Sequence, residues 1–336
     1  MNEISPLVSI ITLTYNHEKY IEKCISSVSN QTYHNFEHII IDDGSTDCTV
    51  DIINSFYKSE NRIKYIRQKN AGLEGIGRNY NKALSLSNGK YIAILEGDDY
   101  WHVHKLRMQV EMMEREESVL CYGRAYTIND SDELLDWFPK ESVFRDEGIS
   151  HNMPTGKFLR LYLFKSVIPS PTIMIRLDVL RSIGGFVQPR YMRVVDYPTV
   201  LHLSLQGRFS YIDQPIAFYR VHLQQATLGN EIPFDSAGKY AAEFFSSLPE
   251  AMKAQLRISE SNLIKNIEVR KALNEFHKGR ILLLEGKFKL ARKYFVKLLR
   301  HNIPEMKIRA IMGLLMSLFH YDLEWLARLV GKRCLK

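Results

Sequence analysis

The chain has 336 residues and a formal net charge of +7, with 45% hydrophobic and 25% charged residues. These values are typical of a globular protein with one large domain and a smaller appendage, and they exclude a chain too small or too polar to bury a core. The N-terminus has no basic segment followed by an apolar one, and no stretch reaches the roughly 18 apolar residues of a membrane span, so we expect a cytoplasmic protein.

Strand and helix patterns alternate over the first third of the chain. A β-rich run at 7–13 is followed by apolar residues at helical spacing over 20–28. The alternation continues with predicted strands at 36–41, 63–67 and 91–95 and predicted helices at 49–57, 77–86 and 105–116. Repeated units of this length predict a mostly parallel, doubly wound sheet flanked by helices.

The pattern loosens between residues 118 and 165. A short strand-like run at 119–122 precedes a polar segment that we expect to be loop-rich and to shape a binding site. Regularity then returns, with a predicted strand at 171–175, helices at 177–183 and 197–205, and a strand at 209–212. We expect this α/β fold to close near 219–222.

The remainder of the chain is strongly helical and has no strand pattern. Small and aromatic residues stand at the positions of a tetratricopeptide-like helix pair, namely Gly279, Gly286, Phe288, Ala291 and Phe295, with Pro304 just beyond. We predict a helical hairpin over about 271–303 and one or two amphipathic helices within 308–330. The expected domains are therefore 1–228 and an all-helical region at 229–336.

The helical region is also basic. Eight cations lie close together: Lys278, Arg280, Lys287, Lys289, Arg292, Lys293, Lys297 and Arg300. Such a face is either a solvated helix surface or a contact for an anionic membrane. An apolar stripe within 308–330 leaves similar alternatives open, namely core, a face for a partner helix, or peripheral membrane contact. No recognition motif for nucleic acid accompanies these residues, so we predict no nucleic-acid partner.

Two acidic tetrads follow two of the predicted strands. Asp42-Asp43-Gly44-Ser45 comes after the apolar run at 38–41, and Glu96-Gly97-Asp98-Asp99 comes after the run at 91–95. In an open parallel sheet the ligand crevice lies outside the carboxyl ends of the strands. Carboxylates gathered there indicate a bound cation or a polyhydroxylated ligand.

Several other classes of enzyme are excluded by their motifs. The glycines at 72–77 do not follow the Gly-x-Gly-x-x-Gly order after a first strand, and no Gly-Lys-Ser/Thr P-loop occurs. The chain also lacks the Gly-x-Ser-x-Gly turn of acyl-transfer enzymes. The four cysteines are scattered without a Cys-x-x-Cys pair, which argues against a zinc ribbon, a redox motif or a disulfide framework.

An ordered set of short motifs does fit one family. The set comprises Val8-Ser9-Ile10-Ile11, Thr14-Tyr15-Asn16, Ser27-Val28, Gln31-Thr32, Phe36-Glu37, Asp42 to Asp47, Arg78-Asn79, Gly89 to Ile92, Glu96 to Trp101 and Tyr219-Arg220-Val221-His222. In this order and spacing the chain resembles the family 2 inverting glycosyltransferases of GT-A fold, from about 7 to 222.

The resemblance implies a Rossmann-like GT-A sheet and a metal-dependent, inverting transfer. The donor would be a nucleotide-diphosphate sugar, most simply a UDP-sugar, and the acceptor a saccharide or lipid-linked saccharide in cell-surface polysaccharide synthesis. The implied cofactor is Mn²⁺ or Mg²⁺, for which hard carboxylate oxygens are suitable ligands. With the basic helical region, we expect a cytoplasmic enzyme in peripheral contact with the inner face of the plasma membrane.

The resemblance assigns the nucleotide to Thr14, Tyr15, Asp43, Arg78 and Asp98. From chemistry alone, a carboxylate such as that of Asp43 can accept a hydrogen bond from a pyrimidine N3–H or a ribose hydroxyl. The neighbouring Asp47 better fits a turn or a helix cap, and we expect it to be structural.

The metal is assigned by resemblance to Asp98, Asp99 and His222. Its role would be to neutralise charge on the leaving nucleoside diphosphate. Glu96 stands where the family has its first aspartate, so the contact of Glu96 with the ribose stays open, as does the choice between Asp98 and Asp99 as the direct ligand.

The predicted general base is Asp196. Inversion by direct displacement needs a base to take the proton of the acceptor hydroxyl, and Val194-Val195-Asp196-Tyr197 stands where the family has an acidic pair before a helix. One member of that pair is Val195 here. The alternative for Asp196 is an ordinary aspartate in the first turn of a helix.

Two other functions are compatible with parts of the chain. A non-catalytic GT-A scaffold that binds nucleotide or glycan would also have this fold, and Val195 in place of an acid favours it slightly. A sugar nucleotidyltransferase would use metal and carboxylates too. It would need a Gly-rich, basic loop after the first strand, and residues 14–17 are not such a loop.

Overall fold

The computed structural model describes residues 5–140, 152–153, 157–222, 235–284 and 286–319. The chain divides into two compact units, residues 1–232 and 233–336. We call them the α/β unit and the helical unit. The predicted boundary at 228/229 lies outside the described residues.

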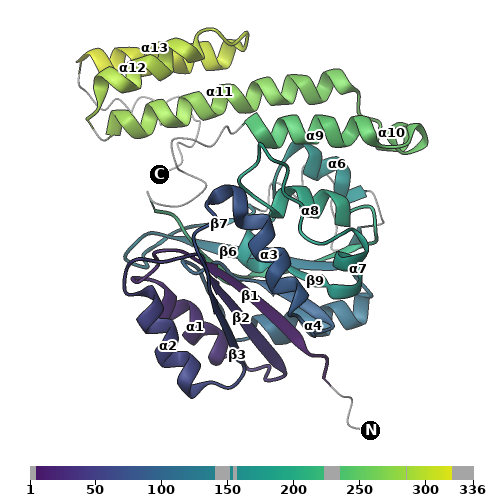
Figure 1. The fold of residues 1–336 in the computed structure, drawn as a ribbon. Helices are drawn as coiled ribbons and strands as arrows, with labels where there is room; N and C mark the ends of the chain where they lie inside the picture. Colours follow the sequence, from purple (N-terminus) through teal and green to yellow (C-terminus); the bar gives the residue numbers. More distant parts are fainter. Residues whose placement is uncertain (1–4, 141–151, 154–156, 223–234, 285, 320–336) are drawn as a thin grey trace. The chain divides into compact units, whose positions relative to one another are not determined.

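One mixed sheet organises the α/β unit (Figure 1). Its strands are β1 (Val8–Thr14), β2 (Phe36–Asp42), β3 (Ile63–Arg67), β4 (Tyr91–Ile94), β5 (Tyr100–Trp101), β6 (Leu120–Ile128), β7 (Leu134–Phe138), β8 (Asn152–Met153), β9 (Met174–Arg176) and β10 (Phe209–Arg220). The strand order is β3-β2-β1-β4-β9-β6-β10-β5, with β7 on β6 and β8 on β10. The first four strands are parallel, as predicted, whereas β9 joins the halves in antiparallel fashion.

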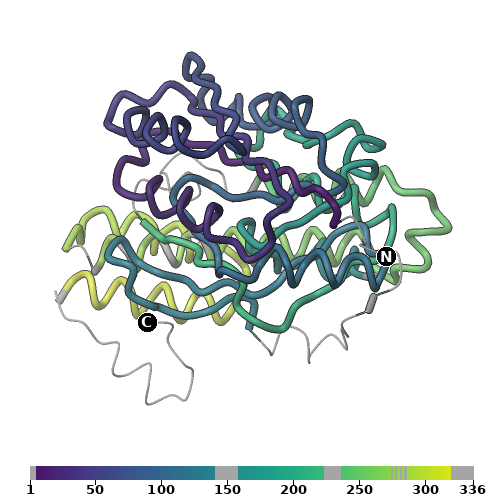
Figure 2. The backbone as a smooth tube through the Cα atoms, turned by 90° about the horizontal axis from the view of Figure 1, so that it is seen from below, coloured from purple at the N-terminus to yellow at the C-terminus, as the bar shows by residue number. Residues whose placement is uncertain are grey.

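Helices lie on both faces of this sheet. They are α1 (Ile21–Ser29), α2 (Thr49–Ser59), α3 (Ile76–Ser85), α4 (Lys105–Glu116), α6 (Lys157–Phe164), α7 (Leu177–Ser182) and α8 (Asp196–Leu203), with short 3-10 turns η1 (Leu73–Gly75) and η2 (Ser170–Thr172). One core cluster packs Ile10, Ile40 and Ala93 of the central strands against α1, α2 and α4. β1 and β2 run side by side although α1 separates them in the chain (Figure 1), and Figure 2 traces the same backbone from purple at the N-terminus to yellow at the C-terminus. The alternation of apolar strands and amphipathic helices therefore produces the predicted doubly wound α/β fold.

The structure corrects the sequence analysis in the middle of the chain. β6 extends to Ile128 and forms a hairpin with β7 where we expected loop, and β10 runs to Arg220 rather than ending near Ile212. Register shifts around Pro215 explain the second error, because a proline and its polar neighbours interrupt the apolar pattern of an otherwise continuous strand. α6 also lies in the segment expected to be loop-rich.

The described part of the helical unit contains α9 (Asp235–Ser247), α10 (Glu250–Leu256), α11 (Glu260–Leu284), α12 (Phe288–Leu298) and α13 (Pro304–Phe319). The helix pair expected over 271–303 is formed by the second half of α11 and by α12. Phe295 of α12 is buried between Gly279 of α11 and Gly313 of α13, where a Cβ atom on either glycine would lie under 3.0 Å from its ring. Small residues are therefore needed at both positions. No described helix is long and apolar enough to cross a membrane.

Candidate active site

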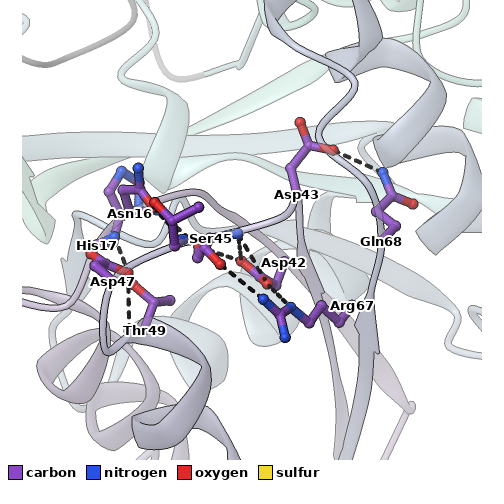
Figure 3. A network of polar contacts seen from close by, with 10 residues as sticks. Asn16, His17, Asp42, Asp43, Ser45, Asp47, Thr49, Arg67 and Gln68 are labelled. Atoms are coloured by element: carbon purple, nitrogen blue, oxygen red, sulfur yellow. Dashed lines mark hydrogen bonds and ion pairs between the residues drawn. The ribbon is translucent and has the colours of Figure 1, made fainter.

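The carboxyl ends of β1 and β2 lie side by side, and the first acidic tetrad begins at the end of β2. Thr14 pairs with Asp42 in the parallel register, and the backbone N–H of Asp43 donates to the carbonyl of Thr14 at 2.9 Å. The two neighbouring aspartates then point in different directions (Figure 3). Asp42 is buried and accepts bonds from both the backbone and the hydroxyl of Ser45, so it shapes the turn. Asp43 points away from that network.

Asp43 is held by donors from two other elements. Its Oδ1 accepts from Gln68 Nε2 at 2.9 Å (Figure 3). The same oxygen accepts from Asn79 Nδ2 at 3.0 Å and from the backbone N–H of Ala71 at 3.1 Å. A carboxylate has about four acceptor sites, so these bonds fix its orientation and leave capacity for a ligand. The nucleotide role of Asp43 stays a prediction.

Asp47 has the structural role that we predicted. Its Oδ1 accepts from the backbone N–H of Thr49 at 3.0 Å, in the first turn of α2, and its Oδ2 accepts from Glu18 N–H at 3.1 Å. Burial works against the charged form, but the bonds from Thr49 and Glu18 outweigh it and lower the pKa of Asp47. Such a side chain caps a helix and ties the loop after β1 to it.

The second acidic tetrad follows β4, and its three acids have different surroundings. Asp98 Oδ2 lies 3.0 Å from Nε2 of His222, which comes from the segment after β10. Burial alone would raise the pKa of Asp98, but His17 and His222 outweigh it and lower the pKa. Asp98 therefore stays ionised beside two imidazoles.

Asp99 points the other way. Asp99 is only 2% exposed, and its Oδ1 accepts from the backbone N–H of Arg220 at 2.7 Å. Burial, followed by the charges of Asp98 and Glu96, raises the pKa of Asp99 well above its usual value. This carboxyl thus holds the end of β10 in place.

Arg220 links the second acidic tetrad to the β6–β7 hairpin. Its Nε donates to the carbonyl of Asp98 at 2.9 Å, and its two terminal nitrogens donate to the carbonyl of Asn129 at 2.7 Å and to Asp132 Oδ1 at 2.5 Å. The guanidinium also lies 4.6 Å from the ring centroid of Tyr20. Arg220 is almost fully buried. Its contacts therefore fix the backbone of Asp98 and the end of β10, which is followed closely by His222.

Glu96 occupies a third environment. Its Oε1 accepts from Ser170 Oγ at 2.6 Å and from Tyr80 Oη at 3.1 Å, while its Oε2 is buried without a partner among the described residues. Burial raises the pKa of Glu96 to about 7, and the charges of Asp98 and Asp196 add to the effect. Glu96 therefore interacts electrostatically with Asp98 of its own tetrad and with Asp196 from α8.

Asp196 is the first residue of α8, far along the chain from the tetrads. Its charge raises the pKa values of Glu96, Tyr80 and Tyr162, after the larger effect of burial on each. Burial also raises the pKa of Asp196 itself, against the lowering effect of backbone N–H groups at the helix start. Its neighbour Val195 is buried, which leaves no second acid at that position of the chain.

The other predicted nucleotide residues lie at the edge of this site. Thr14 is buried, and its Oγ1 lies 3.2 Å from His17 Nδ1. A Cβ atom on Gly97 would approach these two side chains to 2.6 and 2.7 Å, so a glycine is needed between β1 and Asp98. Tyr15 is exposed, and so is Arg78 in the first turn of α3.

Comparison with known proteins identifies the family. The family model described as glycosyl transferase family 2 matches residues 9–183. The chain belongs to glycosyl transferase family 2. The glycosyltransferase TuaG of Bacillus subtilis is 31% identical over 66% of this chain and 81% of its own length. The glycosyltransferase GlyG of Streptococcus pneumoniae is 31% identical over 38% of this chain and 42% of its own length.

Solved structures agree on the GT-A fold of this family 2 glycosyltransferase. S. aureus TarS 1–349, solved in complex with UDP-GlcNAc, superposes with a TM-score of 0.62 at 19% identity and covers 92% of this chain and 88% of that chain. The mannosyltransferase PcManGT of Pyrobaculum calidifontis, in complex with GDP-Man and Mn²⁺, gives 0.53 at 14% identity and covers 95% and 89%. At these identities the likeness extends to the fold alone.

The described residues of the glycosyltransferase do not form a complete set of metal ligands by themselves. Within the described residues, no group of three or more His, Cys, Asp or Glu side chains has a suitable arrangement. The pair formed by Asp98 and His222 is the predicted set that the structure brings together, and Asp99 is turned away from it. An oxygen ligand and an imidazole suit Mn²⁺, and a diphosphate could supply the remaining ligands.

Sequence analysis missed the residues that support these acids. Ser170 and Tyr80 donate to Glu96, and Gln68 and Asn79 donate to Asp43. η2, which contains Ser170, is itself fixed by Trp101, whose Nε1 donates to the carbonyl of Pro171 at 2.7 Å. Trp101 is thus a buried packing residue. Single polar residues in irregular segments leave no periodic pattern in a sequence. Among these four donors only Asn79 had a sequence signal, because it belongs to the family motif Arg78-Asn79.

Proposed function

We propose that the chain transfers a sugar from a nucleotide-diphosphate sugar to a saccharide or lipid-linked saccharide acceptor, with inversion of the anomeric centre. The observation that carries this proposal is the meeting of acids from two distant parts of the chain. Glu96 is held by Ser170 and Tyr80, and the charges of its tetrad neighbour Asp98 and of Asp196 at the start of α8 both raise its pKa, after the larger effect of burial. A donor-binding acid and a candidate base within one site are what a direct displacement requires.

A UDP-sugar is the proposed donor. The structure of TarS 1–349 holds UDP-GlcNAc, and the present chain covers 88% of that fragment. We place the nucleotide against Thr14, Tyr15, Asp43 and Arg78, at the ends of β1 and β2 and the start of α3, with Asp98 beside the diphosphate. The donors around Asp43 hold its carboxylate ready for a base or ribose donor without further ordering.

Mn²⁺ or Mg²⁺ is the proposed cofactor, held by Asp98 and His222. Asp98 keeps a lowered pKa and lies next to His222, whereas the Asp99 carboxyl is occupied by the backbone of Arg220. These differences support Asp98 rather than Asp99 as the direct ligand, with Asp99 as a positioning residue. When bound, the ion would supply neutralisation of the charge on the leaving diphosphate.

Asp196 is the proposed general base. The acceptor hydroxyl oxygen would bond to the anomeric carbon while the bond from that carbon to the diphosphate oxygen breaks, and the hydroxyl proton would pass to the Asp196 carboxylate. Burial raises the pKa of Asp196, and a base whose pKa lies nearer to the working pH takes a proton more readily. The buried Val195 means that no adjacent acid shares this task.

The acceptor, the cellular role and the location complete the proposal. TuaG is named for teichuronic acid biosynthesis, and another relative is the chondroitin synthase of Escherichia coli, 32% identical over 64% of this chain and 29% of its own length. These names support cell-surface polysaccharide synthesis. We place the enzyme in the cytoplasm, with residues 1–228 as the catalytic domain and residues 229–336 in peripheral contact with the inner face of the plasma membrane.

The test is direct. The purified full chain is incubated with MnCl₂, a panel of UDP- and GDP-sugars and oligosaccharide acceptors, and the release of nucleoside diphosphate is measured. A thermal-shift screen of the same donors identifies the one that binds, because a ligand of the folded state raises Tm. We expect release from one donor and a product whose anomeric configuration, read by proton NMR, is opposite to that of the donor. Donor binding without any release would favour the scaffold alternative.

A further inference from the structure

The charges of the chain are divided unequally between its two units. Residues 233–336 carry 20 Lys and Arg against 10 Asp and Glu, a formal charge of +10, so the α/β unit carries −3 of the total of +7. Excess charge of one sign on a small unit attracts a partner of the opposite sign. The partner of the helical unit should therefore be anionic.

Part of this charge forms a stripe on α12. Lys289, Lys293 and Lys297 are exposed and stand four residues apart, so they share one face of the helix, and exposed Arg300 lies just after the helix ends at Leu298. None of these four cations forms an ion pair with another described residue. We call them the basic stripe.

The next helix in the chain, α13, has an apolar stripe. Ile308, Ile311, Leu315 and Leu318 are spaced three, four and three residues apart, and their exposed fractions run from 44% at Leu315 to 61% at Ile308. Another face of α13 is already used for packing, because Met306 and Ala310 belong to the core that α11, α12 and α13 share. This helix is thus apolar on its exposed face as well as on its buried face.

α12 and α13 pack on each other, and both stripes stand on sides of these helices that do not contribute to the core shared with α11. We propose that the basic stripe of α12 and the apolar stripe of α13 together bind an anionic phospholipid bilayer. A helix that lies in a membrane interface places apolar side chains at the boundary of the acyl chains, while nearby Lys and Arg contact anionic headgroups. The proposal extends the membrane contact described under the proposed function by assigning it to particular side chains.

Charge distinguishes this partner from a second copy of the chain. Docking two helical units through α13 would bring two units of charge +10 together, and like charges at short range repel. Anionic headgroups remove that repulsion. The same bilayer also accounts for the apolar stripe, because the surface of an anionic polymer such as nucleic acid offers no hydrocarbon layer.

The experiment measures co-sedimentation of the full chain with vesicles, without donor or acceptor. We expect binding to vesicles of phosphatidylglycerol and phosphatidylcholine and little binding to phosphatidylcholine alone, with loss of binding at high salt. Since the assay needs no sugar, its failure would remove the membrane surface and leave the proposal of glycosyl transfer untouched.

Two variants separate the stripes. Each basic residue near an anionic surface contributes about a fivefold factor, so the triple variant Lys289→Ala, Lys293→Ala, Lys297→Ala should bind about 100-fold more weakly. Leu315→Asp should weaken binding about tenfold or more, because it removes methyl groups that would enter the bilayer and adds a negative charge. The matched controls are a triple alanine variant of Lys19, Lys58 and Lys69 and the variant Leu86→Asp, which change exposed residues of the α/β unit and should bind like the parent chain.

Three results would overturn the proposal. The first is equal binding by the parent chain and both stripe variants. The second is a lipid-free oligomer in sedimentation velocity that Leu315→Asp dissociates, because the apolar stripe would then join two copies. The third is a fall of several degrees in the Tm of Leu315→Asp in the absence of lipid, since the stripe would then be covered by the rest of the chain.

Discussion

The two units of the chain use charge in opposite ways. In the α/β unit the important charges are buried carboxyls with fixed partners, such as Asp42 with Ser45 and Asp99 with the backbone of Arg220. In the helical unit the basic stripe consists of exposed cations that share one side of α12 and its end and form no ion pair with another described residue. Fixed, desolvated charges suit one small ligand of defined shape, whereas mobile, solvated charges suit an extended anionic surface.

This contrast predicts how substitutions should act in each unit. One change in the α/β unit should have a large effect, because each buried carboxyl has a separate role and a fixed geometry. One change in the basic stripe should have a small effect, and effects should add, since solvated charges act nearly independently.

The largest effect is expected for Asp196→Asn. Asparagine keeps the size of the side chain and can still lie at the start of α8, but it cannot take a proton from the acceptor. Loss of a general base lowers kcat by about 10²–10⁴-fold. The measurement is nucleotide release with acceptor present, alongside calorimetric titration of UDP, whose affinity should be unchanged.

Glu96→Gln serves as the comparison for this variant. Glu96 is buried near Asp196 and is the other acid that could act as a base. If Asp196→Asn kept full activity while Glu96→Gln lost it, the base would be Glu96 and the role of Asp196 would be that of a helix-start residue.

The next effect is a difference between two neighbouring acids. Asp98→Asn should weaken Mn²⁺-dependent UDP binding by at least 10–100-fold, the range seen even for residues that only support a metal ligand. Asp99→Asn should change it little, because an asparagine oxygen can still accept from the N–H of Arg220. Calorimetric titration of UDP at fixed MnCl₂ measures both. Equal losses in the two variants would make Asp99 a direct ligand.

The fold was predicted well where buried residues form a continuous apolar run or recur at helical spacing. Strand β2 is buried along its whole length, and the helices after β1 and β2 bury residues at regular spacing, so local patterns sufficed. β7 was missed because nearly all of its residues are exposed, which removes the alternation by which a half-buried strand is recognised. The charged and proline-containing middle of β10 concealed a continuous strand in the same way.

The acids of the site were named from the sequence, but their surroundings were not. The choice between Asp98 and Asp99 depends on His222 and Arg220, which lie more than 120 residues away along the chain. The same holds for Ser170, whose hydroxyl reaches Glu96 only because η2 is fixed by Trp101 and by Gln109 of α4. Such contacts depend on tertiary structure, and no local pattern encodes them.

A smaller effect is expected for Ser170→Ala. The hydroxyl donates to Glu96 at 2.6 Å, and its loss leaves Tyr80 as the remaining described donor to that oxygen. Removing one such bond costs about 1 kcal/mol, which corresponds to roughly a fivefold decrease in kcat/KM. Steady-state kinetics against the donor measure it. Ser85→Ala, which removes an exposed hydroxyl bound to the carbonyl of Lys82, should have no effect, and an equal loss there would show that the kinetic change is unspecific.

The last effect concerns stability rather than activity, and it involves a buried cation of the α/β unit, an exception to the contrast between the units. Lys105 is fully buried in the α/β unit, where its Nζ donates to Gln109 Oε1 at 2.6 Å and lies 3.9 Å from the ring of Trp101. Burial lowers its pKa to about 7. Between pH 7 and about 10.5 the unfolded chain therefore binds a proton that the folded chain does not, so this residue makes stability rise with pH over that window.

Lys105→Met should remove that dependence. The stability of the variant relative to the parent chain should fall by on the order of 1–2 kcal/mol between pH 7 and pH 9, because only the parent gains stability there. Thermal unfolding at both pH values measures the difference, and exposed Lys58→Met should show none. A difference independent of pH would mean that Lys105 stays protonated, and that its contact with the ring of Trp101 is strong enough to keep a full charge inside the α/β unit.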